Sequence, residues 1–120
     1  MSNPHAVVFC ENLDKLDLHT IGPLFENNAI FPDRVNAEFV EVMGRNHLKM
    51  RIWERGCGET QACGTGACAS TVAAVLNGYC DKGADIKVQL PGGDLIVNYT
   101  DKAVYMTGDC VKVFDGVVEI

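Results

Sequence analysis

The stretch Ala67-Cys68-Ala69-Ser70-Thr71-Val72-Ala73-Ala74-Val75-Leu76 decides the fold of this 120-residue chain. It places small or apolar residues on every face of a helix, and it follows the glycine-rich segment 56–66. Asn77-Gly78 provides a C-terminal stop. A helix without a polar face has to be buried. The sequence therefore predicts a central helix over residues 65–76, enclosed by other elements.

Short apolar or alternating segments, typical of strands, flank this helix on both sides. They occupy residues 6–10, 34–43 and 48–53 before the helix, and 85–90, 94–99, 103–107 and 111–114 after it. A short helix is expected at 20–28, with Thr20 as its cap and Pro23 in its first turn. Turn signals such as Pro91-Gly92-Gly93 favour antiparallel neighbours among the later strands. The predicted fold class is α+β, a curved mixed or antiparallel sheet wrapped around one central apolar helix.

Length and composition are those of one globular domain over residues 1–120. Hydrophobic residues make up 48% and charged residues 22%, close to the averages for such domains. The formal net charge is -6 and no run of Lys or Arg occurs, which argues against nucleic acid as a partner. The sequence shows neither a secretory signal pattern nor an apolar stretch of spanning length. We therefore expect a cytoplasmic location and no membrane partner.

The chain contains six cysteines, at positions 10, 57, 63, 68, 80 and 110. We expect all six to be thiols, because the chain is larger than disulfide-rich miniproteins and shows no export signal. Structural zinc is the other interpretation. The spacings around Cys57, Cys63 and Cys68 lack the close Cys-x-x-Cys pairs typical of zinc sites, so we predict no metal site.

Cys63 comes directly before the expected start of the helix, where Gly64 and Gly66 flank Thr65. Glycine lets a backbone approach a ligand closely, and the free N–H groups at a helix start form an anion site with the helix dipole. A substrate carboxylate would fit there. The same environment favours a thiolate, which could exchange a proton with a carbon beside the carboxylate. Alternatively, Cys63 is only a small residue in a tight turn.

Glu54 and Arg55 end a predicted strand, directly before the glycine-rich segment. Arginine can hold a carboxylate through two parallel hydrogen bonds. A glutamate near a thiol can accept its proton or orient it. The alternative is an exposed ion pair without a functional role.

His5 follows Asn3 and the rigid Pro4, immediately before the first predicted strand. This arrangement places two polar side chains around a fixed backbone at the start of a buried element. His5 is therefore a better candidate for a functional histidine than the other two in the chain. A structural histidine with satisfied hydrogen bonds is the alternative.

The segment Glu54-Arg55-Gly56-Cys57-Gly58-Glu59-Thr60-Gln61-Ala62-Cys63-Gly64-Thr65-Gly66-Ala67-Cys68-Ala69 resembles the signature of diaminopimelate epimerases. Asn3-Pro4-His5-Ala6-Val7 resembles the upstream Asn-Pro-His motif of that family. The distance between the two motifs fits the second half of the family's proteins, so the resemblance covers essentially the whole chain. It implies that residues 1–120 form the C-terminal domain of a two-domain enzyme. The N-terminal half, with the first catalytic cysteine in an Asn-Cys-Gly-Asn type motif, is absent from this chain.

The resemblance implies interconversion of L,L- and meso-diaminopimelate, in lysine and peptidoglycan precursor synthesis. The family uses neither pyridoxal phosphate nor metal, so no cofactor is expected. Two cysteines on opposite faces of the substrate act as base and acid, and Cys63 matches the second of them. The implied partners are this small amino-acid substrate and the N-terminal half, and a homodimer is left open. The isolated chain is expected to be inactive or nearly so.

The resemblance also implies roles for residues around Cys63. Glu54 and His5 would assist the thiols. The backbone of Gly64 and Thr65 would bind the α-carboxylate. The implied substrate-binding side chains are Asn3, Asn36, Glu54 and Arg55, with Arg55 at the distal carboxylate. One departure from the family pattern is Cys57, which stands between Gly56 and Gly58 where a small or aliphatic residue is expected.

Three other interpretations compete with this one. Proline racemases and hydroxyproline epimerases also place a cysteine before Gly-Thr-Gly, but their lead-in is Asp-Arg-Ser-Pro, whereas Glu54-Arg55 here opens a different motif. Isomerases of the phenazine-biosynthesis type share the architecture but lack the catalytic cysteine, so Cys63 argues against them. The third is a noncatalytic carboxylate-binding domain. An Asn-Cys-Gly-Asn motif directly upstream in the gene would separate it from the enzyme.

Overall fold

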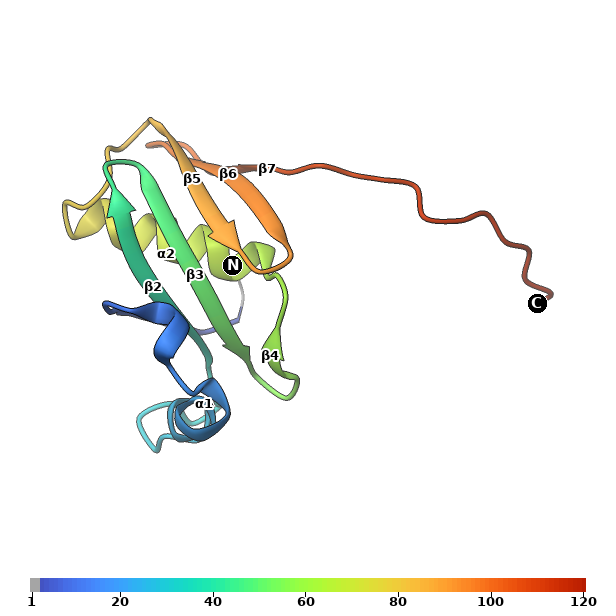
Figure 1. Cartoon of the computed structure of the whole chain (residues 1–120), viewed down its shortest axis with the longest axis horizontal. Coiled ribbons are helices and arrows are strands. Elements are labelled where there is room, and N and C mark those ends of the chain that lie inside the picture. Colours follow the sequence, from blue (N-terminus) through green and yellow to red (C-terminus); the bar gives the residue numbers. More distant parts are fainter. Residues whose placement is uncertain (1–2) are drawn as a thin grey trace.

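The computed structural model describes residues 3–120, and in this part of the chain a seven-stranded sheet packs against one long helix (Figure 1). Met1 and Ser2, which the predicted domain included, lie outside the described residues. The strands are β1 (His5–Phe9), β2 (Asn36–Gly44), β3 (His47–Glu54), β4 (Gly58–Thr60), β5 (Asp85–Leu90), β6 (Gly93–Tyr99) and β7 (Val104–Thr107). The helices are η1 (Leu13–Lys15), α1 (Leu18–Glu26) and α2 (Gly64–Leu76).

The sheet is mixed, with the strand order β1-β2-β3-β5-β6-β7 and with β4 paired to the end of β3. Two neighbouring pairs, β1 with β2 and β3 with β5, run parallel, and the other pairs run antiparallel. The antiparallel β5–β6–β7 meander confirms what the turn signals predicted. A mixed α+β domain is therefore the observed fold class, as expected.

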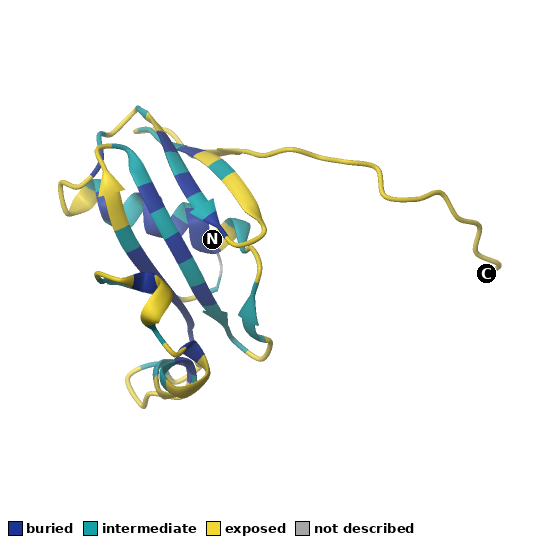
Figure 2. Cartoon of the chain, viewed as in Figure 1, coloured by how far each residue is buried: buried dark blue, intermediate teal, exposed yellow. Residues whose placement is uncertain are grey.

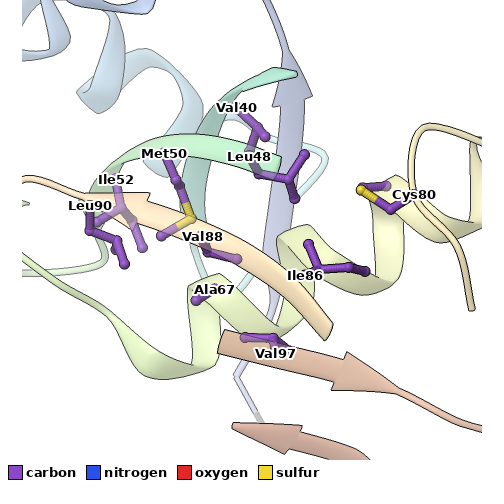
Figure 3. Packing of buried hydrophobic residues seen from close by; sticks show 11 residues of the cluster. Val40, Leu48, Met50, Ile52, Ala67, Cys80, Ile86, Val88, Leu90 and Val97 are labelled. Carbon is purple, nitrogen blue, oxygen red and sulfur yellow. The ribbon is translucent and has the colours of Figure 1, made fainter. Parts of the chain in front are cut away.

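Apolar and polar residues alternate along the central strands, and the apolar ones form the core between the sheet and α2. In β3 the side chains of Leu48, Met50 and Ile52 are fully buried, while their polar neighbours point away from the core. Residues from β2, β5, β6 and α2 complete this cluster, as Figure 3 shows. Full burial of an aliphatic side chain of this size stabilises a fold by about 1.5–3 kcal/mol, so this layer fixes α2 against the sheet.

Helix α2 was predicted over residues 65–76 and spans Gly64–Leu76, so it begins one residue earlier than expected. The buried residues of α2, on the side that faces the sheet, are small, among them Gly66, Ala67 and Ala74. Elsewhere on α2, Val72 is half-buried and Leu76 is 73% exposed. The sheet thus covers one side of α2, and its full enclosure stays a prediction. No helix within residues 3–120 is long and apolar enough to cross a membrane.

The predicted strand at 111–114 is wrong. Residues 108–120 extend away from the domain as an exposed segment (Figures 1 and 2), and Phe114 is 81% exposed. The residues alternate as in a strand, but no neighbouring strand in the described chain pairs with them. A strand without a partner gains neither ladder hydrogen bonds nor a buried face.

The start of the first helix was also predicted wrongly. Asp17, and not Thr20, is the N-cap of α1, and its carboxylate accepts the Thr20 N–H at 3.3 Å. The Thr20 hydroxyl donates to the same carboxylate at 2.6 Å. Pro23 consequently lies inside the helix and not in its first turn. The short elements η1 and β4 were not predicted, because each is too short to show a periodic pattern of apolar residues.

Candidate active site

Cys63 is the N-cap of α2, which confirms its predicted place at the mouth of this helix. Its backbone is extended, with φ -146 and ψ 109, and its Sγ accepts a hydrogen bond from the Gly66 N–H at 3.4 Å. The Thr65 hydroxyl lies 3.4 Å from the same sulfur. The N–H groups of Gly64 and Thr65 have no acceptor inside the helix, because the first turn provides none. The thiol and these donors share the positive end of the helix dipole.

His5 lies against a glutamate that the sequence reading did not single out. His5 Nδ1 is 2.6 Å from Glu38 Oε1, and Nε2 is 3.3 Å from Asn3 Oδ1. The side chain of His5 is 6% exposed and that of Glu38 is completely buried. Burial raises the pKa of the Glu38 carboxyl, and the hydrogen bond from His5 acts in the opposite direction. Alternation in the sequence sets Glu38 opposite the apolar Ala37 and Phe39, but Asn36 to Val40 are all buried, so no sequence pattern marked this glutamate.

Gly66 brings this pair next to the thiol. A Cβ on Gly66 would lie 2.9 Å from Glu38 Oε1 and 3.3 Å from Cys63 Sγ. The carboxylate and the sulfur therefore flank the same point on the helix. Three elements meet here, since His5 begins β1, Glu38 lies in β2 and Cys63 caps α2.

Glu54 ends β3 and is held by the short strand β4 that follows it. Its Oε1 accepts a hydrogen bond from the Thr60 hydroxyl at 2.6 Å. Thr60 is the last residue of β4, and the chain reaches Cys63 three residues later. The Glu54–Thr60 bond therefore fixes the glutamate side chain at the end of β3, and no sequence pattern marked Thr60.

Asn36 and Arg55, both expected to hold substrate, lie next to each other. The side-chain oxygen of Asn36, which is buried at the start of β2, accepts the Arg55 N–H at 2.8 Å. The Arg55 guanidinium donates through Nη1 to the Asp33 carbonyl at 2.8 Å. Asn36 thus anchors the backbone that carries Glu54 and Arg55 at the end of β3.

The glycine-rich loop is fixed from its other side by Glu26, at the end of α1. This buried carboxylate accepts hydrogen bonds from the Gly56 N–H at 2.9 Å, from Trp53 Nε1 at 2.7 Å and from Arg34 Nη1 at 2.9 Å. The Trp53 indole, followed by the Gly56 N–H and Arg34, lowers the pKa of the Glu26 carboxyl. Gly56 has φ 80, a left-handed conformation that glycine adopts without strain. No sequence pattern marked Glu26.

Met106 borders the start of α2 from β7, and it was not anticipated either. A Cβ on Gly64 would lie 3.0 Å from Met106 Cε. The methionine is 50% exposed, and its flexible thioether side chain can adapt to what binds beside it. Only the packing of β7 beside α2 brings these residues together.

A shallow hollow of about 420 Å³ opens beside the His5 pair, on the side of α2 that the sheet does not cover. Asn3, His5, Val7 and Ala69 line it together with three further apolar side chains of α2. A larger hollow of about 600 Å³ at the other end of β1 is lined by Cys10, Glu41 and five others, none of them a predicted site residue. The first hollow is the better candidate for a binding site, because a buried histidine and apolar side chains line it together.

All six cysteines are free thiols in the structure. Burial is the main factor that raises the pKa of Cys10, Cys68 and Cys80, which favours the uncharged thiol at these positions. These three cysteines pack as small apolar residues. Within residues 3–120, no group of three or more His, Cys, Asp or Glu side chains is arranged to hold a metal ion.

The mixed sheet packed against one long helix defines a class of α+β domain that solved structures also show. The chain is similar to a phenazine biosynthesis protein of the PhzF family from Enterococcus faecalis, with a TM-score of 0.60 and 20% identity over 85% of this chain and 36% of that one. It is also similar to the PhzF-family protein from Bacillus anthracis, with a TM-score of 0.54 and 18% identity over 77% of this chain and 29% of that one. At these identities the likeness shows the fold alone.

The particular family follows from sequence. The family model described as Diaminopimelate epimerase matches residues 1–113, and the chain belongs to this family. It is 57% identical over its whole length to diaminopimelate epimerase from Acetivibrio thermocellus, of which it covers 43%. It is 50% identical to that of Bacillus cytotoxicus, over 99% of this chain and 42% of the relative. The chain thus spans about two fifths of the length of these curated relatives.

Proposed function

We propose that this chain supplies one half of the active site of an isomerase that converts L,L-diaminopimelate to meso-diaminopimelate by a two-cysteine mechanism without a cofactor. The observation that carries the proposal is the position of Cys63, whose sulfur caps α2 beside the free N–H groups of Gly64 and Thr65. Residues 1–120 act as the C-terminal domain. The part of the family's proteins that this chain does not cover supplies the other half of the active site, and α2 is the one central apolar helix around which the sheet of this domain wraps.

The start of α2 binds the α-carboxylate of the substrate in this proposal. The N–H groups of Gly64 and Thr65 donate to it, and the positive end of the helix dipole stabilises its charge. The α-carbon is then held beside Cys63 Sγ. Holding the reacting atoms about 3–3.5 Å apart in a fixed orientation lowers the entropic part of the barrier.

Inversion needs a base on one face of the α-carbon and an acid on the other. The thiolate on one face takes the α-proton, and an S–H bond forms while the C–H bond breaks. The electron pair stays on the α-carbon and its carboxylate, whose charge the helix donors stabilise. The thiol on the opposite face then gives its proton to the α-carbon, so that no atom is gained or lost. Cys63 is one of these groups, and Glu54 and His5 assist the two thiols.

The remaining predicted residues hold the rest of the substrate. Arg55 pairs with the distal carboxylate, for which its guanidinium has the matching two-pronged geometry. Asn3 and Asn36 bind the polar groups in between, and Asn36 also keeps Arg55 in place through the 2.8 Å bond to its N–H. Recognition of two carboxylates at a fixed separation selects a substrate with an acid group at each end.

The test is an assay of L,L- to meso-diaminopimelate conversion. The chain alone is expected to show no turnover. Addition of the separately produced N-terminal part of a full-length relative is expected to restore it. Robust turnover by the chain alone would contradict the two-half arrangement. A complex that binds diaminopimelate without converting it would support a noncatalytic carboxylate-binding domain instead.

A further inference from the structure

We infer that Glu38 is a positioning residue of this site, which acts by holding the imidazole of His5 in one tautomer with Nε2 as the nitrogen that exchanges protons. The inference deepens the proposed function and rests on it where activity is concerned. The pairing of Glu38 with His5 itself can be tested without any turnover.

The burial of Glu38 is the first observation. Its side chain is completely buried, and Oε2 has no hydrogen-bond partner among the described residues. Burial of a carboxylate destabilises a fold unless partners compensate for the lost hydration. An apolar residue at this inward position of β2 would stabilise the core better. The one side-chain partner of Glu38 in the described chain is His5, so the pair points to a role beyond packing.

The space around Glu38 is the second observation. Gly66 of α2 lies against the carboxylate, because a Cβ on this residue would lie 2.9 Å from Glu38 Oε1. The same Cβ would lie 3.3 Å from Cys63 Sγ. The glycine therefore leaves room for a buried carboxylate between the histidine and the catalytic cysteine.

The two ring nitrogens of His5 have different surroundings. Nδ1 lies 2.6 Å from Glu38 Oε1, the short distance of a charge-assisted hydrogen bond. Nε2 lies beside Asn3, and Asn3 and His5 both line the open hollow. In the charged ring Nδ1 donates to Glu38 and Nε2 to Asn3. In the neutral ring the hydrogen lies on Nδ1, where the carboxylate accepts it, and the Asn3 amide turns its N–H toward the lone pair of Nε2.

The consequence concerns proton transfer. A histidine that assists a thiol has to present one nitrogen in one protonation state each time the substrate binds. Glu38 ensures this by binding the opposite side of the ring, so it acts on the proton transfer through His5. A neutral amide at position 38 can present either an oxygen or an N–H to the ring, so it does not select a tautomer.

The experiment uses the whole chain, labelled with ¹⁵N, and long-range proton–nitrogen spectra that identify the protonated ring nitrogen. At a pH above the usual histidine range, the neutral His5 ring is expected to carry its hydrogen on Nδ1 alone. In Glu38→Gln a mixture of both tautomers or a shift to Nε2–H is expected. Glu41→Gln is the matched control, since Glu41 lies on the same strand and accepts the N–H groups of Asn12 and Leu13. It is expected to match the unchanged chain.

Two results would overturn the inference. One is an unchanged chain in which His5 carries its hydrogen on Nε2, and this result does not depend on the folding of any variant. The other is a folded Glu38→Gln chain whose His5 tautomer is the same as before. Circular dichroism establishes which variants are folded.

Activity provides the second readout, in the two-half enzyme. Glu38→Gln is expected to lower kcat about tenfold or more, part of the about 10²–10⁴-fold that a positioned acid or base contributes, with KM little changed. A retained kcat would overturn the positioning role. If the unchanged two-half enzyme has no activity, the proposed function fails, and the tautomer spectra still decide whether Glu38 controls His5.

Discussion

The sulfur of Cys63 and the N–H of Gly66 are 3.4 Å apart, so the proposed catalytic thiol is also the cap of the helix at whose start it lies. Side-chain caps usually use an oxygen from Ser, Thr, Asp or Asn. A sulfur in this position accepts a weaker hydrogen bond and is correspondingly more available for other chemistry. Gly66 contributes twice, because its N–H binds the sulfur and its missing side chain leaves room for Glu38.

Substitution of Cys63 separates capping from chemistry. In the two-half enzyme, Cys63→Ala and Cys63→Ser are both expected to lower kcat by at least about 10²-fold, because neither provides a thiol to exchange the α-proton.

Cys63→Ala should also lose about 0.5–1 kcal/mol of stability, whereas Cys63→Ser should lose none, since serine is a favoured cap. Binding of diaminopimelate should persist through the backbone donors of α2. Assays, calorimetric titration and urea unfolding measure the three effects, and Cys57→Ala serves as the control thiol. A near-normal rate in Cys63→Ala would make Cys63 only a turn residue.

Gly66→Ala is expected to destabilise the chain although alanine favours helices by about 1 kcal/mol over glycine. The new Cβ would lie 2.9 Å from both Glu38 Oε1 and Ile52 Cδ1, and these side chains are fully buried. Overpacking of this kind costs about 1–3 kcal/mol, so the loss should outweigh the gain. Urea unfolding measures it. Gly44→Ala is the matched control, because nothing lies within 4 Å of its Cβ position. A Gly66→Ala chain as stable as the unchanged one would contradict the tight contact.

The lowered pKa of Glu26 lets us predict how the stability of the folded chain depends on pH. The Trp53 indole, the Gly56 N–H and Arg34 lower the pKa of this carboxyl in the folded chain. The stabilisation is therefore present above the ordinary glutamate pKa of about 4.3, and it is lost as the pH falls through the lowered folded value. Glu26→Gln should cost about 1.5–3 kcal/mol at neutral pH, and this difference should shrink on acidification.

Urea midpoints over an acid-to-neutral series test this prediction. The exposed Glu11 provides the control, and Glu11→Gln should follow the unchanged chain at every pH. A Glu26→Gln difference that stays constant as the pH falls would show that the carboxylate charge is not what stabilises the glycine-rich loop.

Removal of residues 109–120 should leave the stability of this chain almost unchanged. The segment is exposed throughout, so its loss removes little buried apolar surface. We expect a Tm within about 2 °C of the full chain, less than the shift that 1 kcal/mol produces. A longer truncation that also removes β7 should lower Tm clearly, because Val104–Thr107 pairs with β6. Thermal unfolding compares them, and a large loss in the shorter truncation would reveal contacts that the structure does not show.

The sequence by itself determined the elements whose signals are local. The glycines before residue 67 and Asn77-Gly78 after Leu76 fixed both ends of α2 to within one residue, because caps and stops depend on immediate neighbours. The same holds for β5, whose bounds agree with the prediction. Cys63 at the helix mouth followed from these ends, and the motif around it identified the family.

Only the tertiary structure decided which distant residues meet. The parallel pairing of β1 with β2 brings His5 to Glu38, although 33 positions separate them in the chain. Alternation shows which side of a strand faces inward, but it does not show which strand lies next to it. For the same reason the alternation at 111–114 predicts a strand that does not form. Periodicity records a residue's neighbours in sequence, whereas pairing depends on the order of strands that the whole core selects.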